Sequence, residues 1–226
     1  MGNLLLAIAC FVGAHFLVSS TRLRAILVGA LGERLYLGFY SLLALWLLIW
    51  AGFAYRGAPY VELWGHLPGL AALPLVAMPF ALLLLVAGYT GANPTAVMQQ
   101  PVGPGWKSAG ILAVTRHPLM WAIALWAIAH LAANGDLASL ILFGGIATMA
   151  SAGTRLLDAK KRRAWGERWA PFAASTSNLP FAAIAQGRAR FDPAGIGWWR
   201  LALAGLLYFL LLWLHPIVIG ISAVPL

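Results

Sequence analysis

Long apolar segments alternate with short polar ones along the whole chain. The apolar segments span residues 3–20, 35–55, 70–91, 120–134, 137–157 and 198–221. A helix needs roughly 20 apolar residues to cross a bilayer, and the fourth segment is the only one clearly short of that length. The pattern therefore predicts an all-α, polytopic transmembrane helix bundle of about six spans, without a separate soluble domain.

The composition indicates that much of the protein surface faces lipid and not water. Hydrophobic residues make up 62% of the chain and charged residues only 9%, whereas an ordinary soluble domain has roughly 25% charged residues. The apolar spans contain no Asp, Glu or Lys. Because proton and cation transporters use intramembrane carboxylates, this absence argues against such a transporter.

The basic residues set the predicted orientation. All Lys and Arg residues except Arg56 lie in, or at the edges of, the loops that follow the first, third and fifth spans. The positive-inside rule places these loops in the cytoplasm, so the topology is N-out/C-out. The net charge of +9 is then explained by topology and anionic lipid headgroups, and not by nucleic acid. We expect a multi-pass protein of the bacterial inner membrane.

The first predicted span contains a histidine near its cytoplasmic end. His15 has Ser19 one helical turn further on, on the same face. Ionisable side chains inside a membrane are costly and therefore candidates for function. His15 either forms a hydrogen bond within the bundle or binds a metal or haem, since neutral imidazole is a common ligand.

A second intramembrane histidine, His130, lies in the fourth span. Ala127 and Ala133 flank it on one helical face, and Trp126 borders that face. The small alanines leave room for a flat ring such as a haem, but small residues also serve plain helix packing.

Two further histidines adjoin prolines. Arg116-His117-Pro118 indicates either a helix start, with Thr115 as its cap, or a polar site at the mouth of the bundle. His215 precedes Pro216 in the last span, where we expect it to cover a kink.

Three cytoplasmic segments need separate predictions. Residues 91–117 are rich in Gly and Pro and predict a long loop, of the kind usually kept for function. Residues 155–169 predict a basic helical extension of the fifth span. Residues 178–189 are apolar enough to lie in the membrane interface.

Several motifs together resemble the NnrU family of bacterial membrane proteins, over nearly the whole chain, as one domain of residues 1–226. They include Gly13-Ala14-His15, Gly32-Glu33-Arg34-Leu35-Tyr36, Thr115-Arg116-His117-Pro118-Leu119-Met120, Leu125 to Leu131, Asn134-Gly135-Asp136 and Trp165-Gly166-Glu167-Arg168-Trp169. The family name links it to nitrite and nitric oxide metabolism.

The same pattern is similar to the plant 15-cis-zeta-carotene isomerases. That resemblance implies haem b with His15 and His130 as axial ligands, and redox or isomerase chemistry on a hydrophobic small molecule such as a polyene, served by a redox partner. Arg22 and Arg24, just beyond Ser19, could pair with the haem propionates, and Ser19 is itself a cofactor-binding candidate. Arg116 and His117 are further cofactor-binding candidates. If the ligands were chosen only by their predicted depth in the bilayer, His117 and not His130 would be the partner of His15. The isomerases carry a cysteine where this chain has Ala127.

Two alternatives stay open at this level. Arg116-His117-Pro118 and the region around Gly166 also resemble isoprenylcysteine carboxyl methyltransferases, which implies an S-adenosylmethionine-dependent membrane methyltransferase. However, Asp158-Ala159-Lys160-Lys161 stands where that family has a pair of glutamates. The third hypothesis is a non-catalytic assembly or scaffold protein for denitrification.

Overall fold

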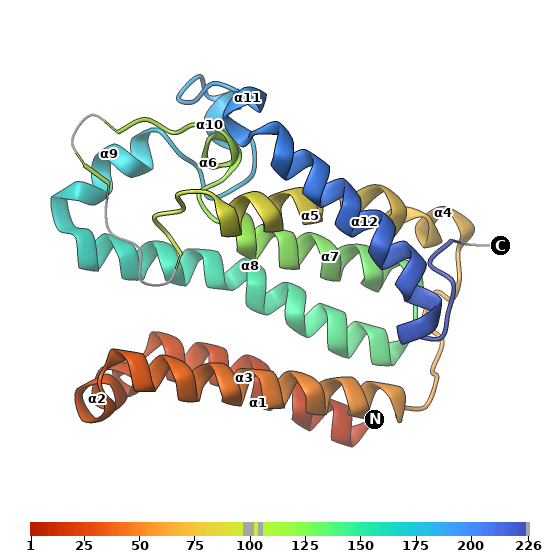
Figure 1. Cartoon of the computed structure of the whole chain (residues 1–226). Coiled ribbons are helices and arrows are strands. Elements are labelled where there is room, and N and C mark those ends of the chain that lie inside the picture. The colour runs from red at the N-terminus through yellow and green to blue at the C-terminus, as the bar shows by residue number, and fades with distance from the viewer. Residues whose placement is uncertain (97–101, 104–105, 225–226) are drawn as a thin grey trace. The chain divides into compact units, whose positions relative to one another are not determined.

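The computed structural model describes residues 1–96, 102–103 and 106–224 (Figure 1). Within these residues the chain is helical, and the only β-type pairing is an isolated bridge between Glu62 and Asp136. The helices are α1 (Gly2–Ser20), α2 (Arg22–Leu31), α3 (Glu33–Arg56), α4 (Pro68–Ala71), α5 (Leu73–Thr90), α6 (Ile111–Val114), α7 (Pro118–Asn134), α8 (Leu137–Trp165), the 3₁₀ turn η1 (Gly166–Arg168), α9 (Trp169–Ala174), α10 (Ala182–Ala185), α11 (Pro193–Ile196) and α12 (Trp198–Val218).

Five stretches of helix are long and apolar enough to cross a membrane: Gly2–Ser19, Glu33–Arg56, Pro68–Thr90, Leu137–Ala174 and Trp198–Val218. The sixth predicted span is α7, whose 17 residues rise only about 26 Å, slightly less than a typical hydrocarbon core. These helices confirm the all-α, polytopic architecture. The large side chains Phe53 and Phe209 are about 70% exposed, which suits lipid-facing positions.

Pro118 begins α7 and does not kink it. Proline is favoured at the first helical position because its missing N–H would have no intrahelical partner there. The fourth span therefore starts two positions earlier than the apolar pattern indicated. Residues 108–115 do not extend it, because α6 is a separate turn and ends in extended backbone at Thr115.

The chain divides into two compact units, which we describe separately. Unit 1 comprises Met1–Ala71 and Ala127–Met149, and unit 2 comprises Ala72–Trp126 and Ala150–Leu226. Helices α7 and α8 each contribute residues to both units.

Unit 1 is built on the antiparallel pair α1 and α3. Near one end Trp50 donates a hydrogen bond to Asn3, and near the other the Tyr36 hydroxyl donates to the Val18 carbonyl. The loop after α3 docks on the turn between α7 and α8, where the Gly135 carbonyl accepts several backbone N–H groups. That turn needs glycine, because Gly135 has φ +66° and a Cβ would lie 2.2 Å from a backbone oxygen.

Unit 2 is built on α5 and α12, which run antiparallel. The Tyr208 hydroxyl donates to the Leu75 carbonyl near one end, and Arg200 contacts Thr90 near the other. Gly88 lets Pro118 approach α5, since a Cβ at that position would lie 2.9 Å from the proline ring.

The predicted helical extension over residues 155–169 is confirmed, because α8 continues to Trp165 and is followed by η1 and α9. Here a cluster of aromatic side chains forms from Trp165, Trp169 and the fully buried Phe172. Trp106, from the loop between α5 and α6, packs against this cluster. Residues 97–101 and 104–105 of the predicted loop 91–117 lie outside the described residues. In segment 178–189 Leu179 and Phe181 are exposed, and its position in the membrane interface stays a prediction.

A close helix contact in unit 1 gives a stability prediction. A Cβ on Gly145 of α8 would lie 2.5 Å from Cγ2 of Ile8 on α1, a stiff β-branched side chain. We expect Gly145→Ala to lower the free energy of unfolding by about 1 kcal/mol or more through overpacking. The midpoint of thermal unfolding in detergent measures it. Gly52→Ala on α3 is the matched control, because a Cβ there has no neighbour within 4 Å. Equal stability of the two variants would contradict this contact.

Candidate functional site

The most densely bonded polar cluster in unit 2 surrounds the carboxylate of Asp158 on α8. The Arg116 guanidinium donates to both carboxylate oxygens at 2.8 Å, and the His117 ring contacts Oδ1 through Nε2 at 2.7 Å. Asn178 donates a further hydrogen bond to Oδ2 at 3.1 Å. We call these four residues the Asp158 cluster.

The segment before α7 presents Arg116 and His117 to this carboxylate. The Arg116 backbone N–H donates to the Ser177 carbonyl at 2.9 Å, and the Thr115 hydroxyl donates to the Asn178 carbonyl at 2.7 Å. The His117 N–H donates in turn to the Thr115 hydroxyl at 3.2 Å. Thr115 therefore does not cap α7 directly, because it ends α6 and its hydroxyl accepts the N–H of His117, before Pro118 begins the helix. It instead joins the segment before α7 to the loop after α9.

The charge of Arg116 is already neutralised by the Asp158 carboxylate. Its bidentate contact with Asp158 is a strong, geometrically specific form of ion pair, and its guanidinium also lies 5.3 Å from the Trp169 ring centre. Both charged side chains are largely buried, at 13% and 14% exposed. Arg116 is thus committed to the fold and is a weak candidate for binding a propionate.

His117 is fixed as a neutral ring with a defined tautomer. The Asp158 carboxylate can only accept hydrogen bonds, so Nε2 of His117 carries the proton and Nδ1 of His117 carries the lone pair. Nδ1 is buried and has no hydrogen-bond partner among the described residues. Burial lowers the pKa of His117 below its usual value, and the positive charges of Arg116 and Lys161 lower it further. The Asp158 carboxylate acts in the opposite direction and raises the pKa.

His15 lies half-buried in unit 1, on α1. Its Nδ1 is 2.8 Å from the Phe11 carbonyl, so Nδ1 carries the proton and Nε2 carries the lone pair. The ring packs against Phe11 and lies 5.6 Å from the Tyr40 ring on α3. The Ser19 hydroxyl donates to the His15 carbonyl. An imidazole whose other nitrogen is held by a backbone carbonyl has the arrangement typical of a metal ligand.

His130 also belongs to unit 1, where its ring packs 5.5 Å from that of Phe143 on α8. Its flanking residues Ala127 and Ala133 are both buried, and Ala127 has no exposed surface. The alanines thus serve close packing, which was one of the two interpretations of this face.

The contacts of unit 1 place His15 and His130 at different depths. His15 lies against Tyr40, whereas Phe143, the neighbour of His130, lies against Tyr55. The stretch of α3 between these tyrosines rises about 22 Å. Two imidazole nitrogens on one iron are only about 4 Å apart, since each metal–nitrogen bond is ~2 Å. The structure does not bring the two rings onto one iron.

The other predicted positions, Arg22 and His215, lie at helix ends. Arg22 begins α2 and is exposed, without an ion pair among the described residues. Its neighbour Arg24 is paired with Glu33 at 2.6 Å. His215 contacts the Ile221 carbonyl through Nδ1 at 2.7 Å, so it covers the end of α12. The described residues contain no group of three or more His, Cys, Asp or Glu that could hold a metal ion.

Sequence reasoning missed Asp158 and Asn178 as partners of the Arg-His-Pro motif. Asp158 is the one carboxylate within the sequence of α8 and stands in a strongly basic stretch. An isolated acid in such a stretch is a signal for a buried ion pair. Asn178 carries no comparable signal, because only the return of the chain after α9 brings it to α8.

Replacing the central carboxylate tests the Asp158 cluster. Asp158→Asn leaves Arg116 without its counter-charge in a largely buried site, so we expect a loss of about 3 kcal/mol in unfolding free energy. Thermal unfolding in detergent measures this loss. Asp192→Asn is the control, since Asp192 caps α11 and asparagine caps a helix equally well. A change no larger than in this control would show that the cluster adds little stability.

The buried His117 predicts a pH dependence. The unfolded chain binds a proton near pH 6.5, whereas the folded chain resists it because the pKa of His117 is lowered by burial. Stability from this group is therefore complete above that pH and falls as pH decreases, by at most ~1.4 kcal/mol per pH unit. Unfolding midpoints between about pH 7 and 5 measure the slope. It should flatten in His117→Gln but persist in His66→Gln, which changes an exposed loop histidine; equal slopes in both variants would refute the assignment.

Comparison with known proteins gives one match. The family model described as "NnrU protein" matches residues 3–223. No curated protein matches, and no solved structure matches, so the likeness to 15-cis-zeta-carotene isomerases stays a prediction. With its membrane-spanning helices and a family match over nearly its whole length, the chain belongs to the NnrU family.

Proposed function

We propose that this protein is an integral membrane haem b protein in which His15 is an axial ligand. The observation that carries the proposal is the hydrogen bond from Nδ1 of His15 to the Phe11 carbonyl. This bond leaves the lone pair on Nε2. Holding one ring nitrogen with a backbone acceptor fixes the tautomer and raises the basicity of the other nitrogen.

The surroundings of His15 suit a flat hydrophobic cofactor in part. The Phe11 and Tyr40 rings pack on the imidazole, which limits its rotation. Arg22, beyond the end of α1, offers an exposed cation for a propionate. Arg24 is less suitable, since Glu33 already neutralises it.

A second histidine would complete the ligands of the iron. The family resemblance assigns this role to His130, yet the two rings lie at different depths. The described conformation therefore does not place the two rings on a shared iron. His117 is less suitable, because its Nε2 is bound to Asp158 and only the buried Nδ1 is unpaired. The two axial positions accordingly need separate tests.

Haem b would supply a redox-active iron that can bind a diatomic ligand or a double bond when an axial position is vacant. The chain's own residues would orient the imidazole and keep the pocket apolar. The substrate class is a hydrophobic small molecule entering from the bilayer, or a nitrogen oxide. A redox partner in the bacterial inner membrane would set the oxidation state.

A methyltransferase function receives less support. Arg116 is held by Asp158 and cannot also bind the carboxylate of S-adenosylmethionine. A pocket of about 220 Å³ is lined by residues of the predicted cytoplasmic loop. This pocket is too small to enclose a whole S-adenosylmethionine molecule. Calorimetric titration with S-adenosylmethionine tests this alternative. Saturable binding would revive it.

The absorption spectrum tests the haem proposal. We expect protein purified in mild detergent after haem-replete expression to show a Soret band that shifts on reduction. His15→Gly should lose the band, and added imidazole should restore it, because the free ring can occupy the vacated position. His66→Gly, in an exposed loop, is the control and should keep the band.

The other histidines decide the second position. Loss of the band in His130→Ala, with retention in His117→Ala, would assign His130 as the second ligand. The proposal fails if the folded wild-type protein has no Soret band. Co-purification with a denitrification enzyme in that case would favour a scaffold role.

A further inference from the structure

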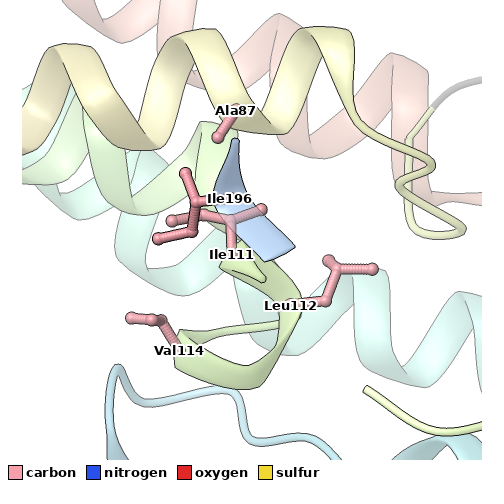
Figure 2. Close-up of a cluster of buried hydrophobic side chains, with 5 residues drawn as sticks. All are labelled: Ala87, Ile111, Leu112, Val114 and Ile196. Carbon is pink, nitrogen blue, oxygen red and sulfur yellow. The ribbon is translucent and has the colours of Figure 1, made fainter. Parts of the chain in front are cut away.

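A pocket in unit 2 lies where α5 ends, beside α6, α11 and the start of α12. Its volume is about 220 Å³, and its lining includes Ala87, Ile111, Leu112 and Ile196. Figure 2 shows these side chains in one apolar cluster with Val114. We call these apolar lining residues the floor of the pocket; its lining also includes the cations Lys107 and Arg200.

Two glycines create the pocket by letting α6 and α11 meet backbone to backbone. A Cβ on Gly110 would lie 2.5 Å from the Gly195 carbonyl oxygen, and one on Gly195 would lie 3.0 Å from the Gly110 nitrogen. Gly110 also has φ +55°. No side chain fits between the segments, so the Gly110–Gly195 contact keeps α6 and α11 close together.

Arg200 is rigidly placed and still has bonding capacity. It donates to the Thr90 hydroxyl at 2.8 Å and to the carbonyls of Thr90 and Ile196 at 3.1 and 2.6 Å. These acceptors are neutral, and a guanidinium has five N–H donors. Among the described residues no carboxylate forms an ion pair with Arg200. The Asp192 carboxylate, which caps α11, lies beside Gly195 of the pocket lining.

Lys107 is exposed and has no ion pair among the described residues. The pocket therefore combines a fixed guanidinium, a flexible ammonium and an apolar floor. That combination matches a ligand with a phosphate at one end and hydrocarbon at the other.

Two tryptophans indicate the depth of the pocket. Trp198 and Trp199 begin α12 and are 78% and 53% exposed, and the Arg200 guanidinium lies 4.6 Å from the Trp199 ring centre. Exposed tryptophans at the end of a membrane span sit at headgroup level. The positive-inside rule assigns this end of α12 to the cytoplasm, where anionic lipids concentrate.

The geometry points to a binding site for the phosphate headgroup of an anionic phospholipid of the cytoplasmic leaflet, held by Lys107 and Arg200. The start of the acyl chains would lie on the floor formed by Ala87, Ile111 and Ile196. The site needs no haem, and it stands or falls independently of the proposed function.

The test measures how short-chain lipids raise the unfolding midpoint of the purified full chain. Dihexanoyl phosphatidylglycerol should stabilise the wild type more than dihexanoyl phosphatidylcholine at equal concentration. Lys107→Gln should weaken the apparent affinity for phosphatidylglycerol about fivefold, which corresponds to ~1 kcal/mol per basic residue at a membrane surface. Lys107→Arg should retain it. Because Lys107 is exposed, these variants should fold normally.

Arg163→Gln is the matched control, since it removes one exposed cation from the same predicted side but outside the pocket. Unchanged affinity in Lys107→Gln would overturn the site. An equal loss in Arg163→Gln would overturn it too, since the attraction would then be diffuse. Stabilisation by glycerol phosphate alone, equal to that by the lipid, would mean that a soluble phosphate and not a lipid is the occupant.

Discussion

The carboxylate of Asp158 joins three separate parts of unit 2. It accepts hydrogen bonds from Arg116 and His117 before α7 and from Asn178 in the loop after α9, while it is itself carried by α8. Burying these charges and polar groups is favourable only when all are paired, so the segments must arrive together. The cluster thereby fixes the point where α7 begins, the extension of α8 beyond its apolar part and the return of the chain after α9.

The apolar helices obey a different constraint. In a bilayer the faces of α3 and α12 need no protein cover, and their large exposed side chains reflect this. Helix association must then come from close packing, and small residues supply it. Gly145 against Ile8 in unit 1 and Gly88 against Pro118 in unit 2 are contacts of this kind.

Three chemically different sites emerge within the described residues. His15 presents a lone pair from a ring fixed by its own helix. The Asp158 cluster is internally satisfied except for Nδ1 of His117, and its main role is structural. The pocket lined by Lys107 and Arg200 also has an apolar lining, and neither cation forms an ion pair among the described residues. A motif such as Arg116-His117-Pro118 can therefore be prominent in sequence without being a free binding site.

The sequence by itself determined the all-α class, the predicted spans and the helical extension after the fifth span, because lipid imposes a minimum length of apolar helix that is visible in composition alone. It also identified Pro118 as the start of α7, since the preference for proline at the first helical position is local. Only the tertiary structure decided that Arg116 forms an ion pair with Asp158 and that Ala127 is completely buried. It also decided that His15 and His130 lie at different levels along α3. These outcomes depend on the registers between helices, which are set by contacts between residues distant in sequence, and helical periodicity carries no information about such registers.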